Sequence, residues 1–165
     1  MLGKPKDGFT EVKVGSQKIG DASAIDDVPM DTLDAFLKYY YYHAPFQVTY
    51  DAVDYYFGLF CFCGRMYIIS NDTDDNGLNI RVVKPEGNRF GTRAIAMNVV
   101  NRLANECVND IRKYIDEWVS WYTLYELTDE RMAERKQILL GRADILERFV
   151  KTEKLIDATW KDTDT

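Results

Sequence analysis

The chain has 165 residues, of which 46% are hydrophobic and 29% charged, so it can bury a core of its own without disulfides or a structural metal. Its 27 acidic and 21 basic residues give a net charge of −6, which argues against a protein that grips nucleic acid through clustered Lys and Arg. Three cysteines and no long apolar run argue against a disulfide scaffold or a membrane span, so we expect a cytoplasmic protein.

Hydrophobic spacing divides the chain into a β-rich first half and a helical second half. We expect residues 1–8 to form a flexible leader, because they are polar and contain no periodic apolar pattern. Residues 9–157 are expected to form one α+β domain, and the polar residues 158–165 a frayed tail. No internal repeat or second domain boundary is visible.

The domain begins with two short β-like runs, residues 9–14 and 17–19, separated by Gly15-Ser16. A glycine followed by a serine between two such runs is typical of a two-residue type II′ turn. The sequence therefore predicts an N-terminal hairpin, which would be stable only when docked on a larger body.

A helix is predicted over residues 31–42, where apolar side chains recur at three- and four-residue spacing. We expect the acidic stretch before it to be a loop and Asp31 to be its N-cap. His43, the only histidine, follows the helix, and its expected role is to cap the C-terminus, where the helix dipole favours a cation.

The middle of the chain predicts a small antiparallel β-meander. Residues 48–57 fit either a helix or a strand, but Tyr55–Cys63 is apolar on both faces and is expected to be a central strand covered on both sides. Met66–Ser70 and Leu78–Lys84 are the expected second and third strands, joined by an acidic turn.

Two long amphipathic helices are predicted in the second half, over residues 92–127 and 130–157. Thr128-Asp129 separates them, and we expect Asp129 to cap the second helix. A short link between two long helices normally gives an antiparallel helical hairpin.

The end of the first long helix is unusually aromatic, with apolar residues around most of its circumference. Such a helix is either buried on all sides or presents part of its surface to a partner, since Trp and Tyr are favoured interface anchors. Core and partner surface are both open readings of this segment. The candidate partner-binding residues are Tyr114, Trp118, Trp121, Tyr122 and Tyr125.

The negative charge is concentrated in residues 21–60, which contain seven aspartates and one lysine. A carboxylate-rich surface can occupy a basic groove in place of DNA. The candidate residues for this acidic surface are Asp21, Asp26, Asp27, Asp31 and Asp34.

Two weaker patterns concern small ligands. Arg81, Arg89 and Arg93 surround the predicted start of the long helix, where exposed amides and guanidinium groups favour an anion. Asp72, Asp74 and Asn76 reproduce the first half of an EF-hand calcium loop, although Val83 stands where that loop needs a bidentate Glu. A loop-to-helix junction and a polar hairpin turn are the structural alternatives.

No serine or cysteine lies in a nucleophile-elbow setting, and the sequence contains too few Cys and His residues for a zinc site. We therefore expect no enzyme and no cofactor. The sequence favours a non-enzymatic protein–protein interaction protein that self-associates, or joins a larger assembly such as a phage particle, through the aromatic helix. The alternatives are an acidic inhibitor of a nucleic-acid enzyme, of the anti-restriction or anti-CRISPR type, and a binder of an anionic small molecule.

Overall fold

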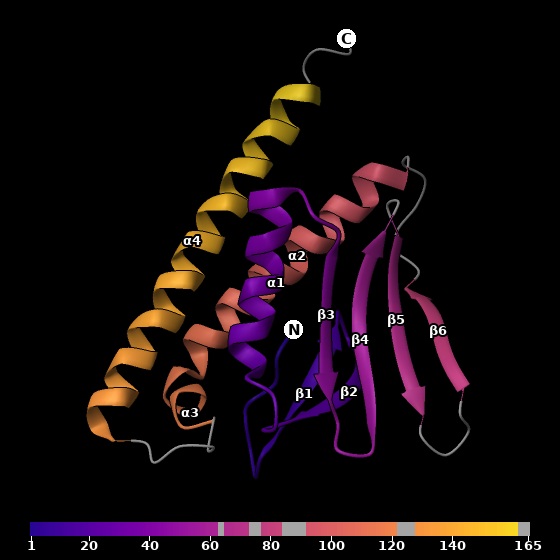
Figure 1. Ribbon diagram of the computed structural model, residues 1–165. Helices are drawn as coiled ribbons and strands as arrows, with labels where there is room; N and C mark the ends of the chain where they lie inside the picture. The colour runs from indigo at the N-terminus through magenta and orange to yellow at the C-terminus, as the bar shows by residue number, and fades with distance from the viewer. Residues whose placement is uncertain (63–64, 73–76, 84–91, 122–127, 162–165) are drawn as a thin grey trace.

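The computed structural model describes residues 1–62, 65–72, 77–83, 92–121 and 128–161. Its α+β architecture, with antiparallel strands and a long C-terminal helix, confirms the predicted fold class (Figure 1). In chain order the elements are β1 (Phe9–Val14), β2 (Gln17–Ser23), α1 (Val28–Tyr42), β3 (Phe46–Asp51), β4 (Tyr55–Phe62), β5 (Arg65–Asp72), β6 (Gly77–Val83), α2 (Thr92–Lys113), α3 (Ile115–Val119) and α4 (Asp129–Lys161).

Strands β1 and β2 form the predicted N-terminal hairpin. Gly15 has a φ of 60° and Ser16 does not have a positive φ, which is the pattern of signs that a type II′ turn requires. The hairpin docks on β4 through Gly20, where an added Cβ atom would lie 2.6 Å from a ring carbon of Phe57. Glycine at this position therefore allows the hairpin to lie against the aromatic ring.

Residues 1–8, which the sequence predicts to be a flexible leader, pack against the body of the domain. Leu2 is buried and forms a β-bridge with Val12 of β1. The nitrogen of Met1 and the backbone N–H of Leu2 both donate to Oδ2 of Asp110 on α2, at 2.6 and 2.8 Å. This segment is ordered because it buries two apolar side chains and because a distant carboxylate holds its backbone.

Helix α1 begins earlier than predicted, and its N-cap is Asp27 rather than Asp31. Pro29 lies in the first turn, a position that tolerates proline because the first N–H groups of a helix have no partner within it. The carboxylate of Asp27 makes no capping hydrogen bond, because it binds the guanidinium group of Arg135 on α4. The ion pair with Arg135 therefore replaces the capping hydrogen bond that the Asp27 side chain would otherwise make.

Two residues with left-handed backbone flank β3. His43, with a φ of 52°, is the C-cap of α1, as expected. Val53, with a φ of 73°, lies in the turn to β4, a strained conformation for a β-branched residue. This turn is held by Asp51, which accepts the N–H of Val53 at 2.6 Å and donates its own N–H to Asp26 at 2.8 Å.

The main sheet has four antiparallel strands in the order β3-β4-β5-β6, so the predicted meander is confirmed and gains one strand. The ambiguous residues 48–57 contain the end of β3, a turn and the start of β4. Their apolar residues fit a helical face as well as a strand, and the pairing with the next strand decides between the two.

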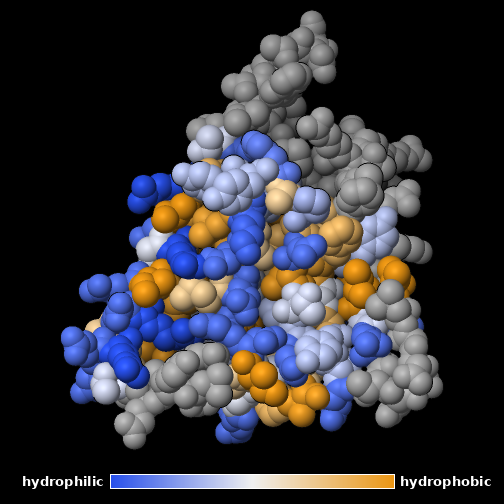
Figure 2. Space-filling view, in the orientation of Figure 1, coloured by the Kyte–Doolittle hydropathy of each residue, from blue (hydrophilic) through white to orange (hydrophobic). Residues whose placement is uncertain are grey.

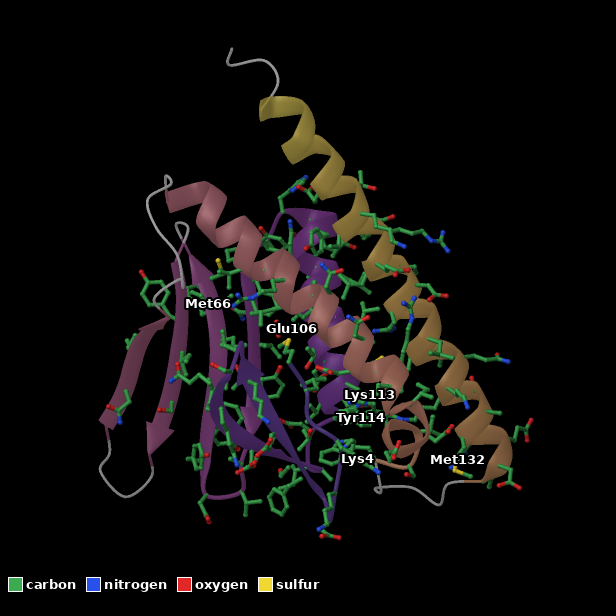
Figure 3. The ribbon with its side chains drawn as sticks, turned by 180° about the vertical axis from the view of Figure 1, so that it is seen from behind. Lys4, Met66, Glu106, Lys113, Tyr114 and Met132 are labelled. Atoms are coloured by element: carbon green, nitrogen blue, oxygen red, sulfur yellow. The ribbon has the colours of Figure 1, made fainter. Side chains whose placement is uncertain are left out.

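The helices and the hairpin cover only one face of this sheet. In Figure 1 the sheet faces the viewer, with α2 and the β1–β2 hairpin behind it, and Figure 3 shows the same arrangement from behind. Helix α1 contacts β3, α2 contacts β5, and α4 packs outside both helices. The covered face supplies the core residues Phe46, Val48, Tyr50, Phe57, Leu59, Cys61, Met66 and Ile68.

The predicted helix over residues 92–127 is not continuous. Helix α2 ends at Lys113, the backbone leaves helical geometry at Tyr114, and the short helix α3 follows. The last part of the predicted helix, residues 122–127, lies outside the described residues. The break turns the aromatic segment inward, as described below.

Helices α2 and α4 run antiparallel, which confirms the predicted helical hairpin. Arg112 of α2 pairs with Asp144 and Glu147, whereas Asp116, further along the chain in α3, pairs with Lys136, nearer the start of α4. The partner in α4 therefore comes earlier in the sequence as the pairing residue in α2 and α3 comes later. This order requires the two segments to run in opposite directions.

The N-cap of α4 is Thr128 rather than Asp129, because the Thr128 hydroxyl oxygen accepts the N–H of Arg131 at 3.3 Å. The helix continues to Lys161, beyond its predicted end, and the rest of the predicted tail lies outside the described residues. Within the part of the chain that is described, no helix is both long enough and apolar enough to cross a membrane.

Candidate functional site

The two tryptophans predicted to be partner anchors lie in the core. Trp118 is 0% exposed, Trp121 is also buried, and the two indoles pack edge to face with their centroids 5.4 Å apart. The indole N–H of Trp121 donates to the backbone oxygen of Asp26 at 3.2 Å, and Arg135 donates to the backbone oxygen of Trp118. Between the two readings of the aromatic helix, the structure therefore favours core for these residues.

Tyr114, the third candidate of that group, is half-buried at the junction of α2 and α3 (Figure 3). The ammonium group of Lys113 lies 4.7 Å from the centre of its ring, a cation–π contact within the chain. Tyr122 and Tyr125 lie outside the described residues. The described part of the segment therefore buries both tryptophans and leaves Tyr114 only partly exposed.

Most of the predicted acidic surface is engaged in ion pairs within the chain. Asp21 pairs with Lys18 at 2.7 Å, Asp27 pairs with Arg135 at 2.6 Å, and Asp34 pairs with Arg142. Asp26 accepts the backbone N–H of Asp51, as described above. Asp27 and Asp34 link the loop before α1, and α1 itself, to α4, and all three pairs reduce the negative charge that a basic partner would meet.

Asp31 is the exposed member of that group, but neighbouring residues partly desolvate its carboxyl group. This partial desolvation, together with the charges of Asp27 and Asp26, raises its pKa above the ordinary 3.8. A carboxyl group with a raised pKa in the folded state is less favourable there when it is ionised. We expect Asp31→Asn to raise the free energy of unfolding at neutral pH, by less than about 1 kcal/mol because solvent screens the site. The gain should shrink as the pH falls through the raised pKa and disappear below 3.8. Denaturant titrations across this range measure it, and a gain independent of pH would show that the charge is not the cause.

The remaining candidates are not brought together by the described residues. Arg81 lies in β6 and Arg93 in α2, with only their backbones described, and Arg89 lies outside the described residues. Among the calcium-loop candidates, Asp72 ends β5, and Asp74 and Asn76 lie outside. The described residues contain no group of three or more His, Cys, Asp or Glu side chains that could hold a metal ion.

The described helices and strands leave the second face of the main sheet uncovered. The prediction that the central strand is covered on both sides is therefore wrong for the described part of the chain. Residues directly opposite one another in the strand register share a face. This surface, here named the open sheet face, carries Gln47, Thr49, Tyr56, Gly58, Phe60, Tyr67, Ile69, Asn71 and Ile80.

Large apolar and aromatic side chains dominate the open sheet face. Tyr56 is 54% exposed and Ile80 is 57% exposed, while Phe60, Tyr67 and Ile69 are half-buried between them. Figure 2 views this side of the molecule and shows hydrophobic residues over the part formed by β4, β5 and β6. One row of directly opposed residues contains one residue from each of the four strands: Thr49, Gly58, Ile69 and Ile80.

Gly58 creates a hollow in the middle of this face. An added Cβ atom would lie 2.6 Å from the backbone oxygen of Val48, so glycine is needed for the close packing of β3 and β4. Without a side chain at this point, the neighbouring side chains surround a hollow of about 180 Å³. A cavity of roughly 150 Å³ holds benzene, so the hollow is large enough for one aromatic or branched side chain. Its walls include Gln47, Thr49, Tyr56, Phe60, Ile69 and Asn71.

The described side chains of the open sheet face are uncharged, apart from the buried Asp51 at one corner. A hydrogen bond and the charge of Asp51 raise the pKa of the neighbouring Tyr56, which keeps the phenol neutral. The described side chains, on a chain of net charge −6, can be desolvated at little electrostatic cost. Their chemistry suits an apolar protein surface, and among them the face offers none of the cations that a nucleic acid requires.

No family model matches the sequence, and neither a curated protein nor a solved structure shows significant similarity to the chain. The description of the site therefore depends on the chain itself. Sequence reasoning did not identify the open sheet face, although its signal is visible in Tyr55–Cys63, a strand that is apolar on both faces. One of those faces meets the helices, and the other forms the open surface.

Proposed function

We propose that this is a non-enzymatic, cytoplasmic protein-interaction protein, and that it binds an uncharged, apolar protein surface through the open sheet face. The observation that carries the proposal is the exposure of Tyr56 and Ile80 beside half-buried aromatic side chains on a sheet face that no described element covers. The partner would place one aromatic or branched side chain in the hollow at Gly58, since buried anchors of this kind dominate binding energy.

The size of the face supports a functional surface of moderate affinity. Four strands about 4.8 Å apart and about six residues long, at about 3.3 Å per residue, span roughly 400 Å². The largest apolar patch on a typical monomeric protein covers about 300–600 Å² and is often functional, so the apolar part of this face is comparable to or smaller than such a patch. The whole face is about half of the roughly 800 Å² per partner of a stable complex, so we expect a transient interaction.

The two alternatives receive less support from the geometry. An acidic inhibitor needs free carboxylates, and three of its five candidate aspartates pair with cations of the same chain. An anion site would need Arg81, Arg89 and Arg93 to converge, and nothing in the described residues bears on that. The buried free thiols of Cys61 and Cys107 agree with a reducing compartment.

The test compares two double variants, each of which replaces one exposed tyrosine and one exposed isoleucine with serine. The first, Tyr56→Ser with Ile80→Ser, alters the open sheet face. The control, Tyr42→Ser with Ile25→Ser, alters an exposed tyrosine on α1 and an isoleucine in the loop before α1, which at 57% is as exposed as Ile80. Both should fold with nearly the stability of the wild type, since surface changes usually alter it by about 0.5 kcal/mol or less.

We expect immobilised wild-type protein and the control variant to retain one partner from a lysate of the native host, and the sheet-face variant to lose it by at least about tenfold, as for loss of hot-spot residues. Quantitative mass spectrometry of the retained proteins measures the difference. If every retained protein binds equally to both double variants, the open sheet face is not the binding surface and the proposal is wrong.

A further inference from the structure

Helix α4 carries a buried stripe of apolar residues and two exposed isoleucines that lie roughly 100° around the helix from it. The inner stripe, with heptad-like spacing, is fully buried against α1 and α2 and consists of Leu139, Ala143, Leu146 and Val150. On the outer side Ile138 is 41% exposed and Ile145 is 43% exposed, seven residues apart and therefore on the same face. Figure 2 shows separate hydrophobic residues among the hydrophilic ones along this side of the molecule.

Gly141 lies between these two isoleucines on the outer side. It is exposed, and nothing lies within 4 Å of the position where its Cβ atom would be. Glycine weakens a helix interior relative to alanine, and no contact with a described residue requires it here. A helix that presents glycine between two branched residues offers a shallow notch into which the side of a second helix fits closely.

The charges on the same stripe favour one direction for that second helix. Glu134 and Arg148 are both exposed. They lie at the two ends of a stripe whose successive residues are four, three, four and three positions apart: Glu134, Ile138, Gly141, Ile145 and Arg148. If an identical helix packs antiparallel about Gly141, Glu134 of one copy lies near Arg148 of the other. In a parallel arrangement like charges would meet instead, so only the antiparallel pair is electrostatically complementary.

We propose that the protein self-associates through the outer side of α4, with a second copy of the chain packed antiparallel about Gly141. Ile138 of each copy then lies near Ile145 of the other, and the Glu134–Arg148 pairs close the two ends of the contact. The stripe is separate from the open sheet face, which lies on the other side of α1 (Figure 1). The dimer therefore leaves the open sheet face of each copy free for a partner.

Sedimentation velocity over a concentration series tests this proposal. The contact is small, so we expect a dimer with a dissociation constant in the micromolar range or weaker. Ile138→Glu with Ile145→Glu should weaken dimerisation at least tenfold, whereas Ile25→Glu, at a more exposed isoleucine elsewhere, should not change it. A wild type that remains monomeric at the highest concentration, or a dimer that the double variant leaves intact, would overturn the proposal.

A charge swap tests the direction of the two helices. Glu134→Arg should weaken the dimer because two arginines then meet, and adding Arg148→Glu should restore it by re-forming the pairs in reverse. A single charge reversal with no effect would contradict the antiparallel arrangement. The Tyr56→Ser, Ile80→Ser variant should dimerise normally, so failure of this inference and failure of the sheet-face proposal are distinguishable.

Discussion

Replacing Trp118 with alanine should lower the free energy of unfolding by about 3–5 kcal/mol, the range for deleting a buried aromatic side chain. The indole is completely buried and packs against Trp121, so its loss leaves a large cavity between α3, α4 and the loop before α1. If the same indole were an interface anchor, its loss would affect association and leave the monomer almost unchanged. Denaturant titration of the variant at low protein concentration measures the effect.

Two controls belong with this variant. Tyr42→Ala removes an exposed aromatic side chain and should change the stability by about 0.5 kcal/mol or less. Trp118→Phe should lose much less stability than Trp118→Ala, partly because the buried indole N–H of Trp118 has no hydrogen-bond partner among the described residues and phenylalanine has no such group. If Trp118→Ala is as stable as the wild type, the indole is not part of the core, and the aromatic segment is again a candidate partner surface.

The second large effect is expected at Asp27. Its carboxylate binds the guanidinium group of Arg135 through two hydrogen bonds of 2.7 and 2.6 Å, and both side chains are mostly buried. Breaking a fully buried ion pair costs about 3–5 kcal/mol because one charge is left unpaired, and partial exposure should reduce this to about 2 kcal/mol for Asp27→Ala. Thermal and denaturant unfolding measure the loss.

Asp21→Ala is the matched control, since the Asp21–Lys18 pair is exposed on both sides and should contribute less than about 1 kcal/mol. A large loss at Asp27 with a small one at Asp21 would show that part of the acidic segment serves the fold. If neither substitution changes the stability, the contact between Asp27 and Arg135 does not stabilise the fold, and Asp27 again counts toward a charged surface for a partner.

The features predicted correctly are those that local patterns determine. The Gly15-Ser16 turn, the alternating strands of the meander and the helical spacing of α2 and α4 each depend on residues close together in sequence. The α+β class follows from the order of these elements. One segment, residues 48–57, satisfies both periods, and only pairing with the neighbouring strands determines its structure.

The features predicted wrongly depend on contacts between distant residues. Asp27 and Arg135 are 108 residues apart, and their pairing removes Asp27 from side-chain capping and fixes the start of α1. Met1 and Asp110 are 109 residues apart, and their contact orders the predicted leader. The break at Tyr114 likewise allows two indoles to enter a core formed by distant elements. No local pattern carries this information.

The candidate site could also have been predicted from the sequence, because Tyr55–Cys63 is unusual in having apolar residues on both faces of the strand. We interpreted it as burial on both faces, which is the common case for a central strand. The helices and the hairpin cover one face of the sheet only, so the same residues form an exposed surface. Counting the elements available to cover each face would have indicated this outcome.

Side-chain footprinting with hydroxyl radicals tests the central claim most directly, because it reports the solvent exposure of Tyr56 and Trp118 in one experiment. In the free protein we expect Tyr56 to be modified rapidly and Trp118 to be protected, in line with their exposures of 54% and 0%. When the captured partner is bound at saturation, Tyr56 should become protected while Trp118 does not change. The account would be contradicted if Trp118 were modified in the free protein and protected in the complex while Tyr56 did not change. That result would identify the aromatic helix as the binding surface.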